Sequence, residues 1–370
     1  MYNFTRTGKN VWWGAMVLGA FIMLLASIPS SGFPTNGVHP RVFNKPGNIL
    51  ISDQFNNRVI EINRFGDIVW QYGNGPTDLT AASPQGVNDA QRVGRLTLIA
   101  ATGIPAGVVP AVPAGNPDNR VLLIDKDGDI LWQYGQFGVT GSGANELNTP
   151  VQATWLPNMH VLITDQGNQR VIEVDMNKTI VWQYGQTGVA GNLFNQLNSP
   201  NSAELLANGH ILIADENNNR VIEVTRDLDI VATFTAQGTL GAAAFASRLP
   251  FNHTLITDAG NNRIVEVNSQ DIVVWQYITN TEAGSDPAPA PSRGIRLRNG
   301  FTIISDQFND RVIVVDRRGK IRETYGNLNV PGYGLLNASQ GLYAPYDAKV
   351  VKDYTGLTPV MRVPFMKGIK

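Results

Sequence analysis

The chain has 370 residues, of which 43% are hydrophobic and 16% are charged, and its formal net charge is −1. This composition is that of a globular protein, and the near-neutral charge argues against a general affinity for nucleic acid or anionic lipid while leaving room for a local charged patch. The sequence contains no cysteine, which excludes disulfides, thiolate metal sites and cysteine nucleophiles.

An uncharged apolar run extends from Val11 to Ile28, shortly after the basic residues Arg6 and Lys9. Its length is close to the ~20 residues that cross a bilayer, and the basic residues before it predict that the chain after it lies outside the cytoplasm. The run is either an uncleaved signal anchor or a signal peptide that is cut before Phe33. We expect a single-pass membrane protein in the first case and a secreted or periplasmic protein in the second.

One sequence unit returns six times, and its most regular copy is VLITDQGNQRVIEVDMNKTIVWQYG, residues 161–185. Each copy holds three short runs rich in Val, Ile and aromatic residues between Asn, Gly and Asp turns, which predicts strands and hairpins. A further strand sequence precedes each copy, such as PVQATWL before the third. Four strands at a period of about 45 residues are typical of a β-propeller blade. The copies occupy residues 49–73, 96–135, 161–185, 211–235, 254–278 and 302–326.

The expected fold is therefore all-β, a six-bladed β-propeller of four-stranded blades with one N-terminal hydrophobic helix. The ring has to close, because an open ring leaves exposed strand edges. One further strand sequence, Pro345 to Val351, follows the sixth copy. Either this strand completes the first blade and closes the ring, or residues 38–46 complete that blade and the tail is peripheral.

The stretch GSGANELNTPVQATWLPNMHVLITDQGNQRVIEV, residues 141–174, resembles the NHL-repeat family of six-bladed propellers. The shared scheme is glycines, an apolar residue and Pro, a strand, a hairpin and then D-x-x-N-x-R-(I/V), and it covers about residues 38–351. That family includes enzymes, RNA binders and protein-binding scaffolds, so the resemblance implies a fold without fixing a function. The phrase NGHILIAD with NNRVIEV is also similar to arylsulfotransferase-type propellers.

These patterns divide the chain into five expected parts. They are a cytoplasmic tail over residues 1–10, a signal-anchor transmembrane helix or signal peptide over 11–29, a linker over 30–37, an NHL-like β-propeller over 38–351 and a C-terminal tail over 352–370.

Asp and Arg recur at fixed positions of the repeat. A residue that is present in every blade is best explained by a need of the blade itself, such as an Asp that accepts backbone N–H groups and pairs with a guanidinium. Blade two keeps the Arg but lacks the Asp at this position. We expect a structural role for Asp53, Arg58, Arg120, Asp165, Arg170, Asp215, Arg220, Asp258, Arg263, Asp306 and Arg311.

Other recurring polar and aromatic residues also favour structural roles. The Glu residues after the Arg are expected in cross-strand pairs, and the histidines at equivalent turns of consecutive blades lie a blade width apart, too far to share a metal. The Trp residues of the W-Q-Y motif are expected to pack the outer strands. We predict no catalytic, cofactor-binding or metal-binding residues. The recurring Glu residues are Glu61, Glu173, Glu223 and Glu266, and the histidines at equivalent turns are His160, His210 and His253. The Trp residues of the W-Q-Y motif are Trp70, Trp132, Trp182 and Trp275.

The clearest break in symmetry is an apolar insertion in blade two, Thr102 to Asp118. Long loops in compact domains are often functional, and an exposed apolar segment would serve as a contact surface. The candidate partner contacts are Ile104, Val108, Val109 and Val112, together with Phe365 in the apolar-basic tail.

The expected function is that of an extracytoplasmic, membrane-tethered and non-catalytic module that binds or assembles proteins, as a subunit of an envelope complex. Its expected partners are a protein and, through residues 11–29, the membrane, with no nucleic acid and no cofactor. The alternative is an extracytoplasmic enzyme of arylsulfotransferase or lyase type, which predicts polar side chains that converge at one channel mouth, including a histidine or a bound divalent cation.

Overall fold

The computed structural model describes residues 42–336 and 340–353. In these residues, 24 strands and six short 3₁₀ helices build the fold. No helix among the described residues is long and apolar enough to cross a membrane. The expected N-terminal helix, the linker and most of the C-terminal tail, including Phe365, lie outside the described residues.

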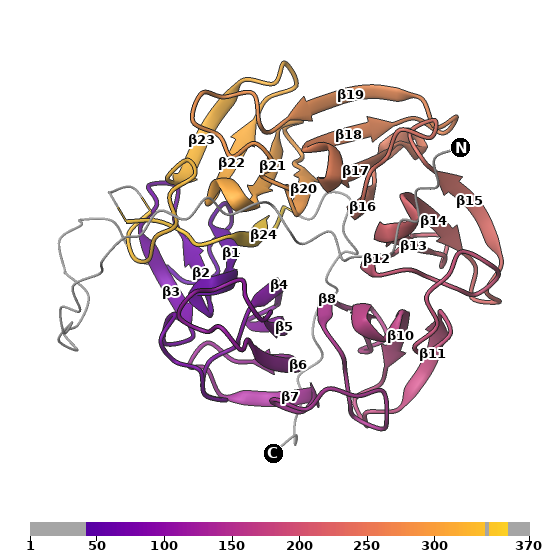
Figure 1. Cartoon of the computed structure of the whole chain (residues 1–370), viewed down its shortest axis with the longest axis horizontal. Coiled ribbons are helices and arrows are strands. Elements are labelled where there is room, and N and C mark those ends of the chain that lie inside the picture. The colour runs from indigo at the N-terminus through magenta and orange to yellow at the C-terminus, as the bar shows by residue number, and fades with distance from the viewer. Residues whose placement is uncertain (1–41, 337–339, 354–370) are drawn as a thin grey trace, which may run out of the picture. The chain divides into compact units, whose positions relative to one another are not determined.

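The strands form six antiparallel four-stranded sheets that stand as blades around a central axis (Figure 1). This confirms the expected all-β, six-bladed propeller. From the axis outward, blade 1 holds β24 (Pro345–Val350), β1 (Ile49–Asp53), β2 (Arg58–Ile62) and β3 (Ile68–Tyr72), and blade 2 holds β4 (Val87–Val93), β5 (Leu96–Ile104), β6 (Asn116–Ile124) and β7 (Ile130–Gly135). Blade 3 holds β8 (Pro150–Trp155), β9 (Val161–Asp165), β10 (Arg170–Val174) and β11 (Ile180–Tyr184), and blade 4 holds β12 (Pro200–Leu205), β13 (Ile211–Asp215), β14 (Arg220–Val224) and β15 (Ile230–Phe234). Blade 5 holds β16 (Ala243–Arg248), β17 (Thr254–Asp258), β18 (Arg263–Val267) and β19 (Val273–Ile278), and blade 6 holds β20 (Arg293–Arg296), β21 (Thr302–Asp306), β22 (Arg311–Val315) and β23 (Ile321–Gly326).

The last strand of the chain closes the ring. β24 pairs antiparallel with β1, with Ile49 opposite Val350 and Ile51 opposite Ala348. The prediction that Pro345–Val351 completes the first blade is confirmed, and the alternative that residues 38–46 do so is wrong.

The core lies between the blades, because both faces of every sheet are covered by neighbouring sheets. At the joint of blades 6 and 1, for example, Ile51 and Ile60 belong to the same buried cluster as Ile303 and Val312. Burial on both faces explains why the inner strands are almost continuously apolar in sequence.

The ring has two ends, which we name by their connections. The turn face carries the turns between the first and second and between the third and fourth strands of each blade. The loop face carries the connections between blades and the 3₁₀ helices η1 (Gln54–Asn56), η2 (Gln166–Asn168), η3 (Glu216–Asn218), η5 (Ala259–Asn261) and η6 (Gln307–Asn309), while η4 (Pro250–Asn252) lies on the turn face.

Both described ends of the body lie on the turn face. The backbone N–H of Gly47 donates to the carbonyl of Val351 at 3.1 Å, and the N–H of Val351 donates to the carbonyl of Asn48 at 2.7 Å. The segment that precedes β1 and the segment that follows β24 therefore leave the ring side by side.

Candidate functional site

The repeated Asp and Arg residues form one buried joint in each blade. Within each joint, Arg Nε lies 2.6–2.8 Å from Asp Oδ2. In blades 1, 3, 4 and 5 the other carboxylate oxygen accepts the backbone N–H that leads into the inner strand, as from Asn148 to Asp165 at 2.8 Å and from Tyr343 to Asp53 at 2.8 Å. In these four blades, the Asp thus binds the end of the connecting loop that leads into its own blade. The pairs are Asp53–Arg58, Asp165–Arg170, Asp215–Arg220, Asp258–Arg263 and Asp306–Arg311.

Blade 2 supplies the missing carboxylate from its insertion. Asp118 pairs with Arg120 and accepts the backbone N–H of Gln85 at 2.8 Å. The sequence analysis missed this residue, because Asp118 stands two positions before the Arg and not five. The available signal was an acidic residue two positions before the repeat Arg.

Blade 6 leaves one oxygen of its joint without a partner. Asp306 Oδ1 is buried and has no hydrogen-bond donor, because Pro289 stands where the other blades offer an N–H. Burial raises the pKa of Asp306 to about 6, although Arg311 opposes the shift.

A second joint links each blade to the next one. The residue after each 3₁₀ helix of the loop face, or its counterpart in blade 2, accepts the N–H that precedes the inner strand of the following blade, at 2.6–3.1 Å. Five of these acceptors in the described residues are amides, Asn57, Asn119, Gln169, Asn219 and Asn262, and the sixth, at the closure of the ring, is Asp310.

The recurring Glu residues tie neighbouring blades together. Within its own blade, Glu223 lies 2.7 Å from Nδ1 of His210, as cross-strand pairing predicts. It also lies 2.7 Å from Nη2 of Arg248 in blade 5, which the sequence analysis did not predict. Burial by itself raises the pKa of Glu223, but the donors His210, Asn208 and Arg248 outweigh it and hold that pKa below its usual value.

The same arrangement recurs around the ring. Glu61, Glu173 and Glu266 meet Arg92, Arg226 and Arg296 of the following blade, and His160 and His253 pair with the Glu of their own blades. The three described histidines therefore lie on the turn face, apart from one another and each with its own Glu.

The repeat Trp residues add a hydrogen bond to their packing. The indole N–H of each donates to a turn carbonyl of the next blade, at 2.8–3.1 Å, from Trp70 to Lys126, Trp132 to Met176, Trp182 to Arg226 and Trp275 to Arg317. Blade 4 has Ala232 at this position, and there the Asp271 carboxylate of blade 5 accepts the N–H groups of Thr235, Ala236 and Gln237.

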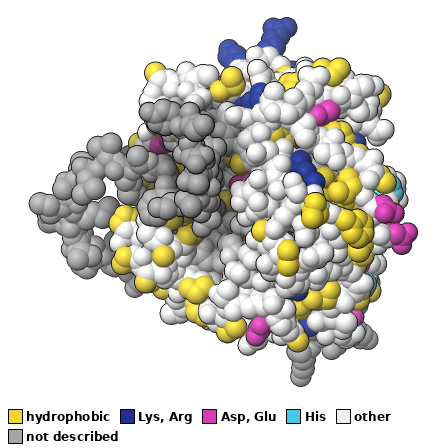
Figure 2. Space-filling model, turned by 45° about the vertical axis from the view of Figure 1, so that its right-hand side comes forward, with side chains coloured by type: hydrophobic (Ala, Val, Ile, Leu, Met, Phe, Trp, Pro, Cys, Tyr) yellow, Lys and Arg dark blue, Asp and Glu magenta, His cyan; other side chains and the backbone are white. Residues whose placement is uncertain are grey.

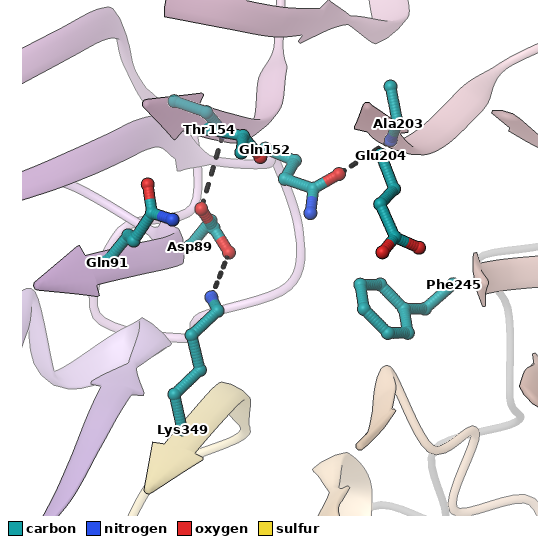
Figure 3. Close-up of a pocket in the computed structure, with 9 residues that line it drawn as sticks. Asp89, Gln91, Gln152, Thr154, Ala203, Glu204, Phe245 and Lys349 are labelled. Carbon is teal, nitrogen blue, oxygen red and sulfur yellow. Dashed lines mark hydrogen bonds and ion pairs between the residues drawn. The ribbon is translucent and has the colours of Figure 1, made fainter. Parts of the chain in front are cut away.

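The channel along the axis is lined by polar side chains together with Phe245, and several of the polar ones bind the backbone of a neighbouring inner strand (Figure 3). Lys349 Nζ lies 2.6 Å from Asp89 Oδ1 and also pairs with Asp347. Gln152 accepts the N–H of Ala203 at 2.6 Å, and Glu204 accepts the N–H of Arg248 at 2.8 Å.

The space left in the channel is small. The cavity between Asp89, Gln152, Glu204, Phe245 and Lys349 offers about 10 Å³ to the centre of a water-sized sphere, which is room for about one water. This cavity is therefore too small for a larger molecule in the described structure.

Burial controls the charges in the channel. It raises the pKa of Glu204 well above the usual value, because the single backbone donor offsets only part of the lost solvation. Burial also acts to lower the pKa of Lys349, but the carboxylates of Asp347 and Asp89 outweigh it and raise that pKa.

Arg293, at the start of β20, links the inner strands of several blades. Its guanidinium is buried and donates to Asn201 Oδ1 at 3.1 Å, to the Ala244 carbonyl at 3.2 Å and to the Val151 carbonyl at 3.3 Å. It also stacks on the Tyr346 ring at 4.8 Å. No repeat pattern marks this residue, so the sequence analysis did not single it out.

The insertion of blade 2 packs inward, and the expectation that it exposes its apolar side chains is wrong. Ile104, Val109 and Val112 are only 3%, 8% and 7% exposed. They form a cluster with Phe55 of blade 1 and Ala344 before β24, against which Val108, Phe308 and Tyr343 also pack. The insertion therefore covers the joint where the ring closes, since it touches blades 1 and 6 from blade 2.

The most exposed apolar pair in a repeated position is Leu193 and Phe194, on the loop face between blades 3 and 4. Their side chains are 69% and 65% exposed. The preceding connection has Gly143 and Ala144 at these two positions. The repeat pattern is defined by its strands, so this change in a connecting loop was not among the predicted contact residues.

The two loops share a backbone conformation. In each, the first Gly donates to the carbonyl of a buried Leu, from Gly141 to Leu147 at 3.1 Å and from Gly191 to Leu197 at 3.0 Å. The Leu193–Phe194 pair is thus displayed by an ordered loop. Figure 2 shows hydrophobic side chains gathered among polar ones on the side of the ring that carries β15.

The fold has known counterparts. No family profile and no curated protein matches the sequence. A protein of unknown function from Bacteroides caccae matches with a TM-score of 0.53 and 17% identity, over 76% of this chain and 93% of that one. A streptogramin B lyase structure matches with a TM-score of 0.51 and 12% identity, over 77% of this chain and 80% of that one. At these identities the likeness shows the propeller fold alone.

Proposed function

We propose that this chain is an extracytoplasmic, membrane-tethered β-propeller of the NHL type that acts as a non-catalytic module for binding or assembling proteins. The observation that carries the proposal is the exposed Leu193–Phe194 pair on an ordered loop. Large apolar side chains that a rigid loop presents to solvent are typical of the anchor residues of protein interfaces.

The channel supports a binding role over catalysis. Lys349 pairs with Asp89, while Gln152 and Glu204 accept backbone N–H groups, and the cavity between these side chains holds about one water. The enzyme alternative expects a histidine or a bound divalent cation at the channel. The side chains that line the cavity include no histidine, and no group of three His, Asp or Glu among the described residues could hold a metal ion. We therefore do not propose an arylsulfotransferase or lyase activity.

The proposal is tested by purifying the tagged chain from its native host in a mild detergent and identifying co-purifying proteins by mass spectrometry. The double variant L193G/F194A gives this loop the residues of the preceding connection, so we expect an unchanged fold. We expect the partner to be recovered with the wild type and to fall about tenfold with the variant, since an interface anchor contributes about 1.4 kcal/mol or more.

The matched control is Phe251→Ala, which removes a 93% exposed apolar side chain from the turn face. We expect this variant to retain the partner. Recovery of the same proteins with wild type and L193G/F194A would contradict the proposal, and so would loss of the partner with Phe251→Ala alone. The same sample shows by its N-terminal peptide whether residues 1–32 are kept.

A further inference from the structure

The turn face is divided into a basic half and an acidic half. The basic half comprises the turns of blade 6, the turns and chain ends of blade 1 and the first turn of blade 2. Among the described residues of these segments, eight exposed basic side chains stand against three acidic residues. The basic residues are Lys45, Arg64, Arg95, Arg298, Arg317, Arg318, Lys320 and Lys352.

The three acidic residues of the basic half are already engaged. Asp316 is buried and accepts from Arg322 and from the N–H of Lys320. Asp67 accepts from the Asn63 amide at 3.0 Å, and Asp353 accepts from the backbone N–H of Arg298 at 3.1 Å. With eight exposed basic side chains against three acidic residues, the net charge of this half is positive.

In the remaining turns of this face, acidic residues outnumber basic ones. In the described turns between the third and fourth strands of blades 2 to 5, seven aspartates stand against three basic residues. The aspartates are Asp125, Asp127, Asp129, Asp175, Asp227, Asp229 and Asp271, and the basic residues are Lys126, Lys178 and Arg226. The near-zero net charge of the chain hides this separation.

The chain ends lie within the basic half. The Asn44 side chain donates to the Gly94 carbonyl at 2.6 Å, beside Arg95, and Asp353 binds the turn of Arg298. The thirteen residues between Ile28 and Val42 can span at most about 45 Å. In the proposed tether, this length limits how far Val42, in the basic half, can lie from the apolar run.

Apolar side chains accompany the positive charge. Phe65 and Val42 are 43% and 45% exposed, and the Arg64 guanidinium lies 4.6 Å from the Phe65 ring centre. Exposed aromatic and aliphatic groups among Lys and Arg suit the interface between lipid headgroups and acyl chains.

From this juxtaposition we propose that the basic half of the turn face lies against the membrane and binds anionic phospholipid headgroups. The inference rests on the proposed membrane tether and deepens it, because it states which end of the ring faces the bilayer. The acidic half and the loop face, with Leu193 and Phe194, then point away from the lipid.

Lysine labelling tests the proposal on the full chain, reconstituted in vesicles of phosphatidylcholine with or without phosphatidylglycerol. An amine-reactive reagent that does not cross membranes is added on the side of the body, and mass spectrometry follows each lysine. We expect Lys45, Lys320 and Lys352 to react about fivefold more slowly in the anionic vesicles, and high salt to remove the protection. Lys126 and Lys178, on the acidic half, should react equally in both.

Two variants with the same change in net charge sharpen the test. R317E/R318E should abolish the protection of Lys320, whereas K126E/K178E should leave it intact, and thermal melting checks that both variants are folded. Protection that is absent, equal in both vesicle types or kept by R317E/R318E overturns the proposal while the tether stands. A full chain that associates with neither vesicle type overturns both the tether and the lipid surface.

Discussion

At the scale of single residues, Asp310 distinguishes the closing joint from the other joints between blades. It accepts the N–H of Ala344 at 2.9 Å, in the position that neutral amides occupy elsewhere. Burial raises its pKa to about 7, with further repulsion from Asp53, Asp286 and Asp306. Among the joints between blades, the stability of the closing joint therefore depends on whether its acceptor, Asp310, is protonated.

The change Asp310→Asn tests this dependence. The unfolded chain ionises Asp310 above pH of about 4 and the folded chain only above about 7, so the folded state binds more protons between these values and stability falls as the pH rises. We expect the variant to raise the free energy of unfolding by about 2–4 kcal/mol at pH 8 and to change it little at pH 4. Urea unfolding at both pH values measures this.

The matched control places an acid at a joint that now has an amide. Asn57 is buried and accepts the N–H of Gly86 at 3.0 Å, so Asn57→Asp should lower stability at pH 8 more than at pH 4. A difference between Asp310→Asn and wild type that is the same at both pH values would contradict the proposed role of ionisation.

Residue patterns in the sequence predicted the joints only where the repeat is regular. The spacing D-x-x-N-x-R identifies the Asp–Arg pairs because each occupies one register position. Asp118 departs from that spacing, and Arg293 has no counterpart in the other blades. The contacts from one blade to the next, such as Arg248 with Glu223, depend on which sheets become neighbours and leave no local pattern.

At the scale of elements, the insertion of blade 2 is a packed part of the ring. Val112 is 7% exposed in a cluster with Phe55 and Ala344. Val112→Ala removes two buried methyl groups and should lower the free energy of unfolding by about 1–2 kcal/mol, measured by urea unfolding. Val108→Ala, at a half-buried position of the same loop, should cost less. Equal and negligible effects of both changes would contradict the packing.

The strands could be predicted from sequence because Val, Ile and aromatic runs between turn residues repeat six times. The orientation of the insertion could not, because an apolar loop has the same sequence whether it faces solvent or a neighbouring blade. The insertion faces inward because it packs against Phe55, Phe308 and Tyr343, which come together only once the ring is closed.

At the scale of the whole molecule, the ring depends on its last strand. β24 pairs with β1, and its Lys349 reaches Asp89 of blade 2. A chain that ends after Leu342 should lose its cooperative thermal transition, because blade 1 then lacks its inner strand and leaves an open edge. A chain that ends after Asp353 keeps β24 and is the control.

The addition of a peptide covering residues 343–353 to the shorter chain should restore a cooperative transition, since the strand can pair in trans. Circular dichroism and size-exclusion chromatography follow both states. A chain ending after Leu342 that melts like the control would contradict the closure of the ring by β24.

The closing strand also sets a time order for folding. β1 and its partner β24 are separated by almost the whole length of the body, from residue 49 to residue 350. At synthesis rates of roughly 5–20 residues per second, the first blade waits on the order of 15–60 seconds for its inner strand. Until then the ring stays open, so the closing contacts between β24 and β1 cannot form during most of the synthesis of the chain.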